Sequence, residues 1–308
     1  MTSIRDFLYV RLYRLFSFLA LRLPRPVIVH IAQTLAFLLW HLIPSRRHVI
    51  LINLELAFPG CYSDEEKAAI GKASYTNFIM TALTLAQLEH FTPEEFLSMV
   101  EFRGEEHLRQ ALDEGKKIIF VTAHYGNWEL TPPATTLRFG ISCSIVGRRL
   151  DSEALHQIIT PIRERFFVKI IDKHGATKGM INALNQGEAV GILVDQNITK
   201  RYGIPVEFFG HTVSHTPLAS ILARKFDAVL LPVFVSTEDH LRYTVEYLPP
   251  LPTLRSDDKE RDIREMTQAQ ASVTEEKIRQ KPELWLWMHK RWKAYHRRRY
   301  EEPPKEGS

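Results

Sequence analysis

The sequence lacks most of the signals that mark cofactor-dependent, disulfide-stabilised or serine-dependent enzymes. Only two of its 308 residues are cysteines, Cys61 and Cys143, which excludes a disulfide framework and favours a reducing compartment. It contains neither a P-loop nor the glycine fingerprint of dinucleotide-binding folds. It also has no G-x-S-x-G nucleophile elbow, which argues against a serine acyl-enzyme.

Basic residues only slightly outnumber acidic ones in the sequence. The 40 Lys and Arg residues and the 36 Asp and Glu residues leave a net charge of +4, which is too small to indicate a nucleic-acid partner. Basic residues gather near the N-terminus and at the C-terminal end, where Trp285, Trp287 and Trp292 precede an Arg-Arg-Arg run at 297–299. Two interpretations stay open. This region faces an anion such as a membrane surface, or its tryptophans lie in the core and its basic residues in solvent.

No apolar run reaches the roughly 20 residues that a membrane-spanning helix needs. Residues 27–43 come close, and residues 7–21 carry apolar side chains at helical spacing together with Arg11 and Arg14. That pattern is typical of a helix lying in a membrane interface. We therefore expect residues 1–43 to form a membrane-associated helical anchor, and no small-residue cleavage site marks them as a signal peptide. A spanning helix and a buried core helix stay open for residues 27–43.

Strand-like and helix-like segments alternate from residue 44 onward. Strands are expected near residues 118–121, 141–146, 168–171, 188–194, 229–235 and 243–247, with helical patterns between most of them. This alternation predicts an α/β fold with a mostly parallel central sheet flanked by helices. Ser63 and Glu66 form a capping-box pattern that starts a helix running toward Leu88. We expect one domain over residues 44–300 and a disordered tail at 301–308.

The most informative stretch is KKIIFVTAHYGNWEL, residues 116–130. Its apolar first half predicts a strand buried on both faces, and His124 follows at the strand end, where α/β proteins bind ligands. Imidazole titrates near neutral pH and accepts protons from hydroxyl groups, so His124 is a candidate general base. Glu129, in a helix starting near Asn127, would reach back to orient the imidazole. Gly126 would permit the tight turn. A His and a Glu five residues apart also occur by chance in solvated loops.

HYGNWE at 124–129 resembles the H-x4-D/E signature of the bacterial lipid A late acyltransferases, the lauroyl/myristoyl transferase family. That signature alone is shared with the wider glycerolipid acyltransferases, so the further matches matter more. They follow the family's order over most of the chain: RERFFVKII (163–171), NQGEAVGILVDQN (185–197), VEFFG (206–210), TPLASILARKFDAVLLPVF (216–234) and PELWLWMHKRWK (282–293).

The resemblance implies an enzyme that moves a fatty acyl chain from acyl-carrier protein to a hydroxyl of a lipid A precursor, at the cytoplasmic face of the inner membrane. His124 would be the general base, with Glu129 orienting it, and the hydroxyl would attack the thioester directly. The resemblance implies neither a metal nor an organic cofactor. The partners would be the acyl-carrier protein thioester, a glycolipid acceptor and an anionic membrane surface.

Several further residues are candidates for substrate binding. Arginine forks bind phosphate bidentately, and the family uses an arginine of the RERFF-like segment in its active site. Arg163 and Arg165 both match that arginine, and the sequence does not distinguish them. Asp195 ends a buried strand and matches an aspartate in or beside the family's site. Arg149 and Asn127 are the other two candidates for substrate binding.

Two histidines, His211 and His215, lack a third ligand at a recognisable spacing, so we expect no metal site. Asn197 stands where some relatives carry a second acid, which puts a role for that acid in doubt. Two rival functions stay open. One is an acyltransferase of the same fold acting on a lysophospholipid or a phosphoinositol mannoside. The other is a non-catalytic membrane-binding protein with a decayed site, against which the intact His124, Glu129 and Asp195 argue.

Overall fold

The computed structural model describes residues 4–147 and 149–301. Of the tail at 301–308 that we expect to be disordered, residues 302–308 fall outside this part of the chain.

A seven-stranded sheet of order β1-β9-β8-β2-β5-β3-β4 forms the centre of the molecule. Every neighbouring pair is parallel except β8 and β9, so the mostly parallel α/β sheet expected from the sequence is confirmed. The strands are β1 (Val100–Arg103), β2 (Ile118–Thr122), β3 (Cys143–Gly147), β4 (Val168–Asp172), β5 (Ala189–Leu193), β8 (Val229–Ser236) and β9 (Tyr243–Tyr247).

Helices cover both faces of the sheet, which is why the central strand β2 is buried throughout and apolar up to its last residue, Thr122. Side chains alternate between the faces of a strand. Ile118 and Phe120 pack with α6 (Glu105–Asp113) and α7 (Thr131–Phe139), whereas Ile119 and Val121 pack with α9 (Ala176–Asn185) and α10 (Leu218–Phe226). The two remaining helices beside the sheet are α5 (Pro93–Leu97) and α8 (Glu153–Arg163).

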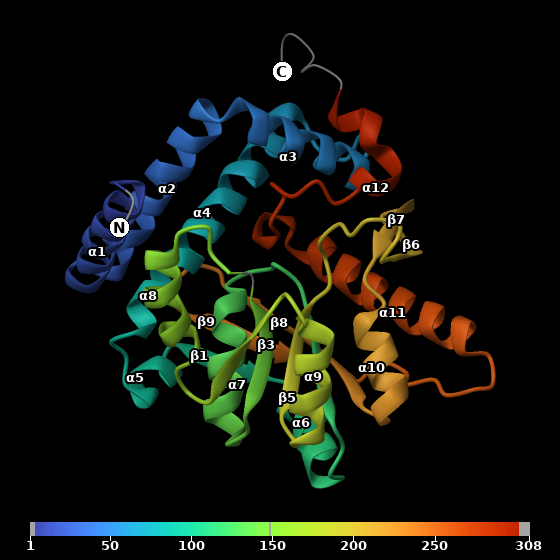
Figure 1. The fold of residues 1–308 in the computed structure, drawn as a ribbon. Helices are drawn as coiled ribbons and strands as arrows, with labels where there is room; N and C mark the ends of the chain where they lie inside the picture. Colours follow the sequence, from blue (N-terminus) through green and yellow to red (C-terminus); the bar gives the residue numbers. More distant parts are fainter. Residues whose placement is uncertain (1–3, 148, 302–308) are drawn as a thin grey trace.

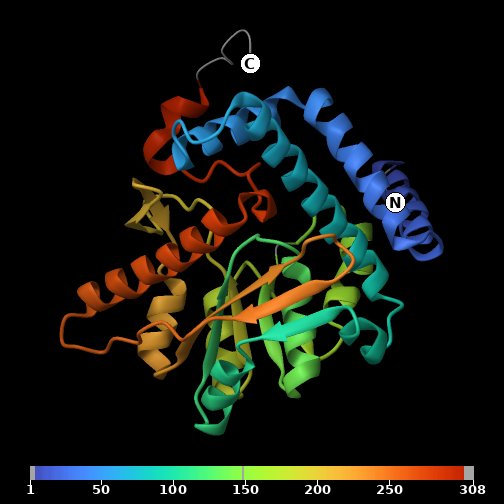
Figure 2. The ribbon, with the colours of Figure 1, turned by 180° about the vertical axis from the view of Figure 1, so that it is seen from behind.

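Four N-terminal helices form an arch over one end of the sheet (Figures 1 and 2). They are α1 (Ile4–Arg22), α2 (Arg25–Leu42), α3 (Pro44–Ala57) and α4 (Asp64–Leu88). The capping box of Ser63 and Glu66 starts α4 as expected. Asn77 of α4 donates a hydrogen bond to the Gly126 carbonyl over 2.9 Å, so the arch covers the carboxyl end of β2.

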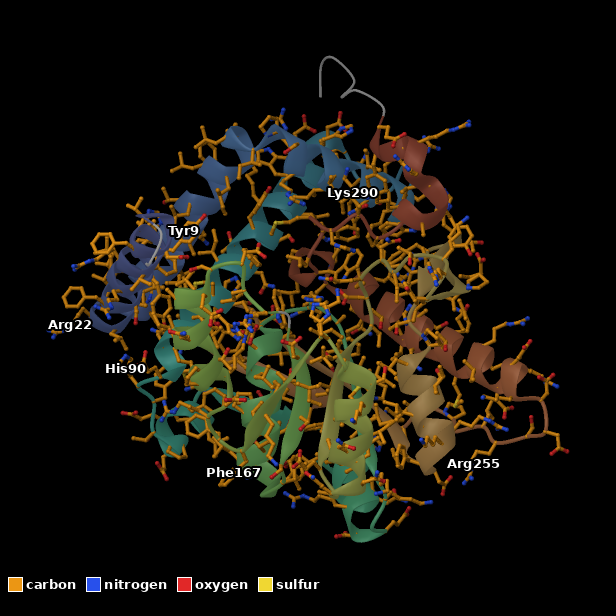
Figure 3. All side chains as sticks on the ribbon, in the orientation of Figure 1. Tyr9, Arg22, His90, Phe167, Arg255 and Lys290 are labelled. Carbon is orange, nitrogen blue, oxygen red and sulfur yellow. The ribbon has the colours of Figure 1, made fainter. Side chains whose placement is uncertain are left out.

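The outer surface of the arch is unusually apolar. Side chains of α1 project into solvent (Figure 3, where Tyr9 and Arg22 are labelled). The large apolar residues exposed on α1 are Phe7, Leu8, Tyr9, Leu12, Leu15, Phe18, Leu19 and Leu21. In the described part of the chain, no single helix has the length and hydropathy to cross a membrane, although α2 and α3 meet that test together across a 95° bend.

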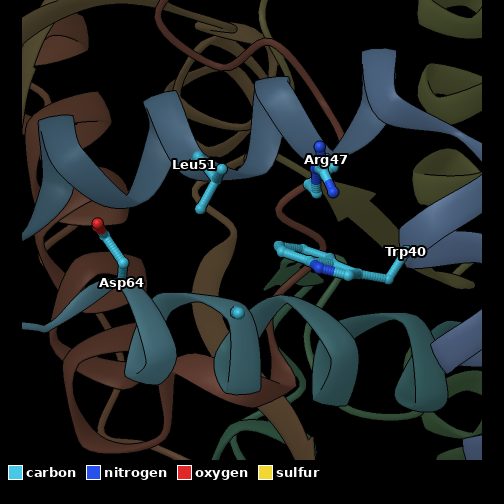
Figure 4. A pocket seen from close by; sticks show the side chains of 5 residues that line it. Trp40, Arg47, Leu51 and Asp64 are labelled. Atoms are coloured by element: carbon cyan, nitrogen blue, oxygen red, sulfur yellow. The ribbon is translucent and has the colours of Figure 1, made fainter. Parts of the chain in front are cut away.

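Hollows lie beside the helices of the arch. One, of about 100 Å³, lies between α3 and α4 and is lined by Trp40, Arg47, Leu51, Asp64 and Ala68 (Figure 4). It contains none of the candidate site residues. Another is an open, almost wholly apolar groove of about 370 Å³ between α1 and α8, lined by Tyr9, Leu12, Tyr13, Leu15, Phe16, Leu19, Leu155 and Ile159.

The C-terminal segment packs against the arch and a small hairpin. After α11 (Lys259–Gln280) come η2 (Pro282–Leu284), α12 (Lys293–His296) and η3 (Arg297–Tyr300). Trp285, Trp287 and Trp292 are fully buried, so the structure decides between the two interpretations of the tryptophans in favour of the core. They pack with Phe208 and Phe209 of the hairpin formed by β6 (Ile204–Phe208) and β7 (His211–His215).

Candidate active site

His124 and Asp195 lie side by side because their strands are parallel neighbours. Thr122 of β2 is opposite Leu193 of β5, and the Val194 amide donates to the Thr122 carbonyl over 3.0 Å. Each of the two candidate residues follows its strand by two positions. The carboxyl ends of parallel strands meet at one edge of the sheet, so the two side chains meet there. Asp195 Oδ1 lies 2.8 Å from His124 Nδ1, and Asp195 Oδ2 accepts the His124 backbone N–H over 3.0 Å.

The surroundings keep the Asp195 carboxylate ionised and favour protonation of the His124 imidazole. Burial alone raises the pKa of Asp195, but the attraction of His124 and hydrogen bonds from His124 and Trp285 outweigh it and hold that pKa well below its usual range. Burial lowers the pKa of His124, but Asp195, and to a lesser extent the charge of Glu129, raise it above its ordinary value. Because an ionised Asp195 only accepts hydrogen bonds, His124 carries a proton on Nδ1.

The opposite ring nitrogen of His124 is therefore the basic one. The side-chain amide of Gln196, which is exposed, lies 3.2 Å from Nε2 and marks the direction of its lone pair. The ring of Trp128 stands edge-on to the imidazole, with 5.1 Å between ring centroids, and stacks in turn on Phe78. An acceptor hydroxyl that displaced Gln196 could donate a hydrogen bond to Nε2, next to the Trp128 ring.

Glu129 does not make the contact expected from the sequence. The chain after Asn127 forms a short 3-10 turn, η1 (Trp128–Leu130), before α7 begins at Thr131. This turn sends Glu129 to Arg163 of α8, whose Nε donates to Glu129 Oε2 over 2.9 Å and whose second guanidinium nitrogen reaches the other carboxylate oxygen. Asp195 takes the place on Nδ1 that we expected Glu129 to fill. Glu129 acts on His124 only through its charge.

The other candidate arginines are separated by the structure. Arg163 joins the site through Glu129. Arg165 instead donates to the backbone carbonyls of Leu88 and Phe91, so it caps the end of α4. Arg149 lies on the surface and pairs with Glu153, the first residue of α8. Of the two arginines that the sequence did not distinguish, Arg163 is the one joined to the site, through Glu129, whereas Arg165, like Arg149, is bound elsewhere.

Asn127 has an unusual environment. Its side chain is only 1% exposed, yet neither its amide nitrogen nor its amide oxygen has a hydrogen-bond partner among the described residues. Buried amide groups are almost always paired with protein or with ordered water. Asn127 therefore offers unused donors and an unused acceptor three residues after His124.

Residues that were not among the candidates from the sequence hold the turn after β2. Trp285 pairs with Tyr125 in an antiparallel bridge. On either side of it, the Gly126 amide donates to the Leu284 carbonyl over 2.9 Å, and the Leu286 amide donates to the His124 carbonyl over 3.0 Å. The only available signal was the aromatic PELWLW run, because a buried indole N–H needs an acceptor.

Gly126 permits this turn, as expected from the sequence. Its φ is +54°, and a Cβ at this position would lie 1.6 Å from the Val235 carbonyl oxygen.

Two more missed residues support the loop after β5. His289 Nε2 accepts the Asn197 amide over 2.8 Å, and burial lowers the pKa of His289 to about 4, so it is neutral. Arg291, which is completely buried, donates to the carbonyls of Gln196 and Ser214. Together they fix the backbone that carries Asp195.

The remaining candidate groups have structural roles. His211 Nε2 lies 3.1 Å from the Leu56 carbonyl, and His215 Nδ1 accepts from Arg291 over 2.8 Å. Within residues 4–147 and 149–301, no three His, Cys, Asp or Glu side chains converge as a metal site requires. Cys143 is buried, and burial raises the pKa of its thiol to about 12, so it is not a thiolate nucleophile.

Similarity to known proteins extends over nearly the whole chain. Residues 3–294 match the family model described as bacterial lipid A biosynthesis acyltransferase. The lipid A biosynthesis lauroyltransferase of Escherichia coli K12 is 28% identical over 90% of this chain and 88% of its own length. The lipid A biosynthesis palmitoleoyltransferase of the same organism is 24% identical over 89% and 87%. The phosphatidylinositol mannoside acyltransferase of Mycolicibacterium smegmatis is 24% identical over 72% and 71%.

The family model covers nearly all of the sheet, the arch and the His124 turn. An α/β fold with a histidine at the end of its central strand, and a family match over this length, lead to one conclusion. The chain belongs to the bacterial lipid A biosynthesis acyltransferase family.

Proposed function

We propose that the protein transfers a fatty acyl chain from the thioester of acyl-carrier protein to a hydroxyl of a lipid A precursor. The observation that carries this proposal is the His124–Asp195 pair, which leaves Nε2 of the imidazole as a base at the open side of the site. The relatives named for lipid A biosynthesis support the choice of acceptor.

In the proposed reaction, His124 Nε2 takes the proton of the acceptor hydroxyl as its oxygen attacks the thioester carbonyl. The carbon–sulfur bond of the resulting tetrahedral adduct then breaks. The proton passes from the imidazolium to the departing thiolate, which leaves the carrier as a free thiol. Asp195 stabilises the imidazolium between these two steps, as the acid of a hydrolase triad does. No covalent acyl-enzyme forms.

We propose that Arg163 and Glu129 serve the substrate together. Arg163 presents a planar fork that suits a phosphate, and its bond to Glu129 keeps it turned toward the site. Glu129 also raises the pKa of His124, which makes the imidazole a stronger base. Asn127 lies three residues after His124 and has unused hydrogen-bond donors, so we assign it to a substrate oxygen or to a water that the substrate displaces.

The membrane is part of this proposal. The exposed apolar face of α1 and the open groove between α1 and α8 would lie in the headgroup region of the inner membrane, on its cytoplasmic side, where the acceptor lipid is held. Residues 1–43 would supply most of the affinity, and the basic C-terminal run would add a salt-dependent part.

A specific comparison supports a second acceptor class. The relative from Mycolicibacterium smegmatis is named for phosphatidylinositol mannoside, so acylation of a phosphoinositol mannoside is the alternative, with a lysophospholipid as a further one.

The test is an assay of the purified protein with acyl-carrier protein thioester and each acceptor in turn, with products identified by mass spectrometry. We expect acyl transfer to the lipid A precursor and little to the other acceptors. Lipid A from a deletion strain should then lack one acyl chain. Transfer only to a lysophospholipid or mannoside would replace the proposed acceptor. An inactive protein in every assay would favour a decayed site.

A further inference from the structure

We propose that Trp285 is a positioning residue for catalysis, acting through Asp195. Its indole N–H donates to Asp195 Oδ2 over 2.9 Å, in a fully buried contact between residues 90 positions apart. The inference rests on the proposed role of His124 as the base.

The bond completes a set of three donors around one carboxylate. Asp195 Oδ1 binds the His124 ring, and Oδ2 accepts both the His124 backbone N–H and the Trp285 indole. Asp195 is only 4% exposed, so water does not replace a lost donor easily. Without the indole, Oδ2 would keep one donor, and the carboxylate could rotate away from the geometry that holds the imidazole.

The indole itself is held rigidly. The Ser74 hydroxyl donates to the Trp285 carbonyl over 2.5 Å, and the residue bridges to Tyr125 next to His124. Its ring packs edge-on against Trp287 and Phe208, with centroid distances of 4.6 Å and 5.9 Å. A donor fixed on both backbone and ring directs the carboxylate, because a rigid supporting group limits the orientations of the group it binds.

A neighbouring residue provides a matched control. Trp287 is equally buried and belongs to the same aromatic cluster, but its indole N–H donates to the Pro282 carbonyl over 2.7 Å. Replacing either tryptophan with phenylalanine removes similar packing. Only the change at Trp285 removes a donor from the site.

The test compares Trp285→Phe with Trp287→Phe in steady-state kinetics of the detergent-solubilised full chain. We expect Trp285→Phe to lower kcat by about 10-fold or more with KM changed by less than about 3-fold, because the lost bond stabilises the imidazolium formed during the reaction. Trp287→Phe should keep kcat within about 3-fold of the wild-type value. It should lower the melting temperature about as much as Trp285→Phe does. Equal losses of kcat in the two variants, or an unchanged kcat in Trp285→Phe, would overturn the inference.

A second variant covers the case in which Trp285→Phe does not fold. Incorporating benzothienylalanine at position 285 replaces the indole N–H by sulfur and preserves the bicyclic shape. We expect the same loss of kcat from it. Asp195→Asn supplies a further check, because Trp285→Phe should have little additional effect on kcat in that background if it acts through Asp195. Independent, multiplied losses would contradict the mechanism.

A readout without substrate separates this inference from the proposed function. The Nδ1 proton of His124 should give a far-downfield proton NMR resonance, identified by its loss in His124→Ala. We expect it in the wild type and in Trp287→Phe, and we expect it shifted or broadened in both Trp285 variants. If the wild type transferred no acyl group, the proposed function would fail while this resonance still tested Trp285. An unchanged resonance in both Trp285 variants would reject the inference.

Discussion

At the scale of single residues, the candidate site is built around one histidine, His124, whose two ring nitrogens have different neighbours. Nδ1 faces a buried carboxylate, and Nε2 faces an exposed amide. The sequence could predict His124 from its place after a buried strand. It could not predict which acid contacts it, because Asp195 is 71 positions away and Glu129 only five. We expected the nearer acid, Glu129, to contact the imidazole, but the 3-10 turn at residues 128–130 brings it to Arg163 instead.

The first prediction concerns the base. His124→Ala should lower turnover by about 10²-fold or more, because the acceptor hydroxyl would lose its proton acceptor. The melting temperature should fall as well, because the change leaves the buried Asp195 carboxylate without its ring partner, so turnover is compared at a temperature at which both proteins are folded. Acyl transfer measured with acyl-carrier protein thioester tests this, and exposed His90→Ala is the control. Near-normal turnover in His124→Ala would remove it from the mechanism.

The second prediction concerns pH. His124 must be neutral to act as a base, so kcat/KM should fall as the pH drops through its pKa, which Asp195 and Glu129 hold above the ordinary value. Glu129→Gln removes one of these negative charges. Its acid limb should therefore move to lower pH, in addition to any loss of turnover from the released Arg163. A pH–rate profile measures both effects. An acid limb that moved upward in Glu129→Gln would contradict the electrostatic role.

At the scale of helices and strands, local sequence patterns predict most individual elements but not how they are arranged. Six of the seven strands of the sheet and the capped start of α4 were expected and are present, whereas the edge strand β1 was not expected. The helix expected to begin near Asn127 starts later, at Thr131. The hairpin of β6 and β7 was missed, because its sequence reads as an aromatic run and its strands pair only with each other. The order of the sheet strands depends on packing between distant segments, which a local pattern does not contain.

The turn after β2 gives the third prediction. Gly126→Ala should lower the free energy of unfolding by about 2 kcal/mol or more, because φ is positive and the new Cβ would meet the Val235 carbonyl. Gly140 also has a positive φ but open space around it, so Gly140→Ala is the matched control and should cost about 1 kcal/mol. Urea denaturation of both variants measures the difference. Equal losses would mean that the close approach to Val235 is unimportant.

At the scale of the whole molecule, one face of α2 lies in the protein core, whereas α1 exposes an apolar face to solvent. Ile28, Ala32, Ala36 and Trp40 of α2 are buried in the same core as α4 and the C-terminal tryptophans. The outer face of α1 is apolar and exposed. Removing residues 1–43 would therefore uncover α4 as well as delete the expected anchor. Surface substitutions are the cleaner way to test membrane binding.

The fourth prediction concerns that surface. Changing Leu8, Leu12 and Leu15 together to Ser should weaken vesicle binding by at least about 10-fold, because burying each leucine contributes roughly 1.5–3 kcal/mol. Vesicle flotation measures it, and Phe167→Ser, which changes an apolar residue that is 66% exposed elsewhere on the molecule, is the control. Binding that survived the triple change at high salt would place the anchor outside α1.

Charge should add a separate component. Neutralising residues 297–299 should weaken binding to anionic vesicles at low salt and have little effect at high salt, where charges are screened over a few Å. Vesicles of uncharged lipid should show no difference between the variant and the wild type. A loss that persisted at high salt would indicate misfolding of the C-terminal segment instead.

The bonds that join residues 124–126 to residues 284–286 also set an order of events during protein synthesis. The ribosome makes the apolar N-terminal helices before the PELWLW segment. Under the proposed membrane binding of α1, a nascent chain would reach the bilayer while its histidine still lacks the segment that holds its turn. We expect the site to be complete only after residues 284–286 have left the exit tunnel.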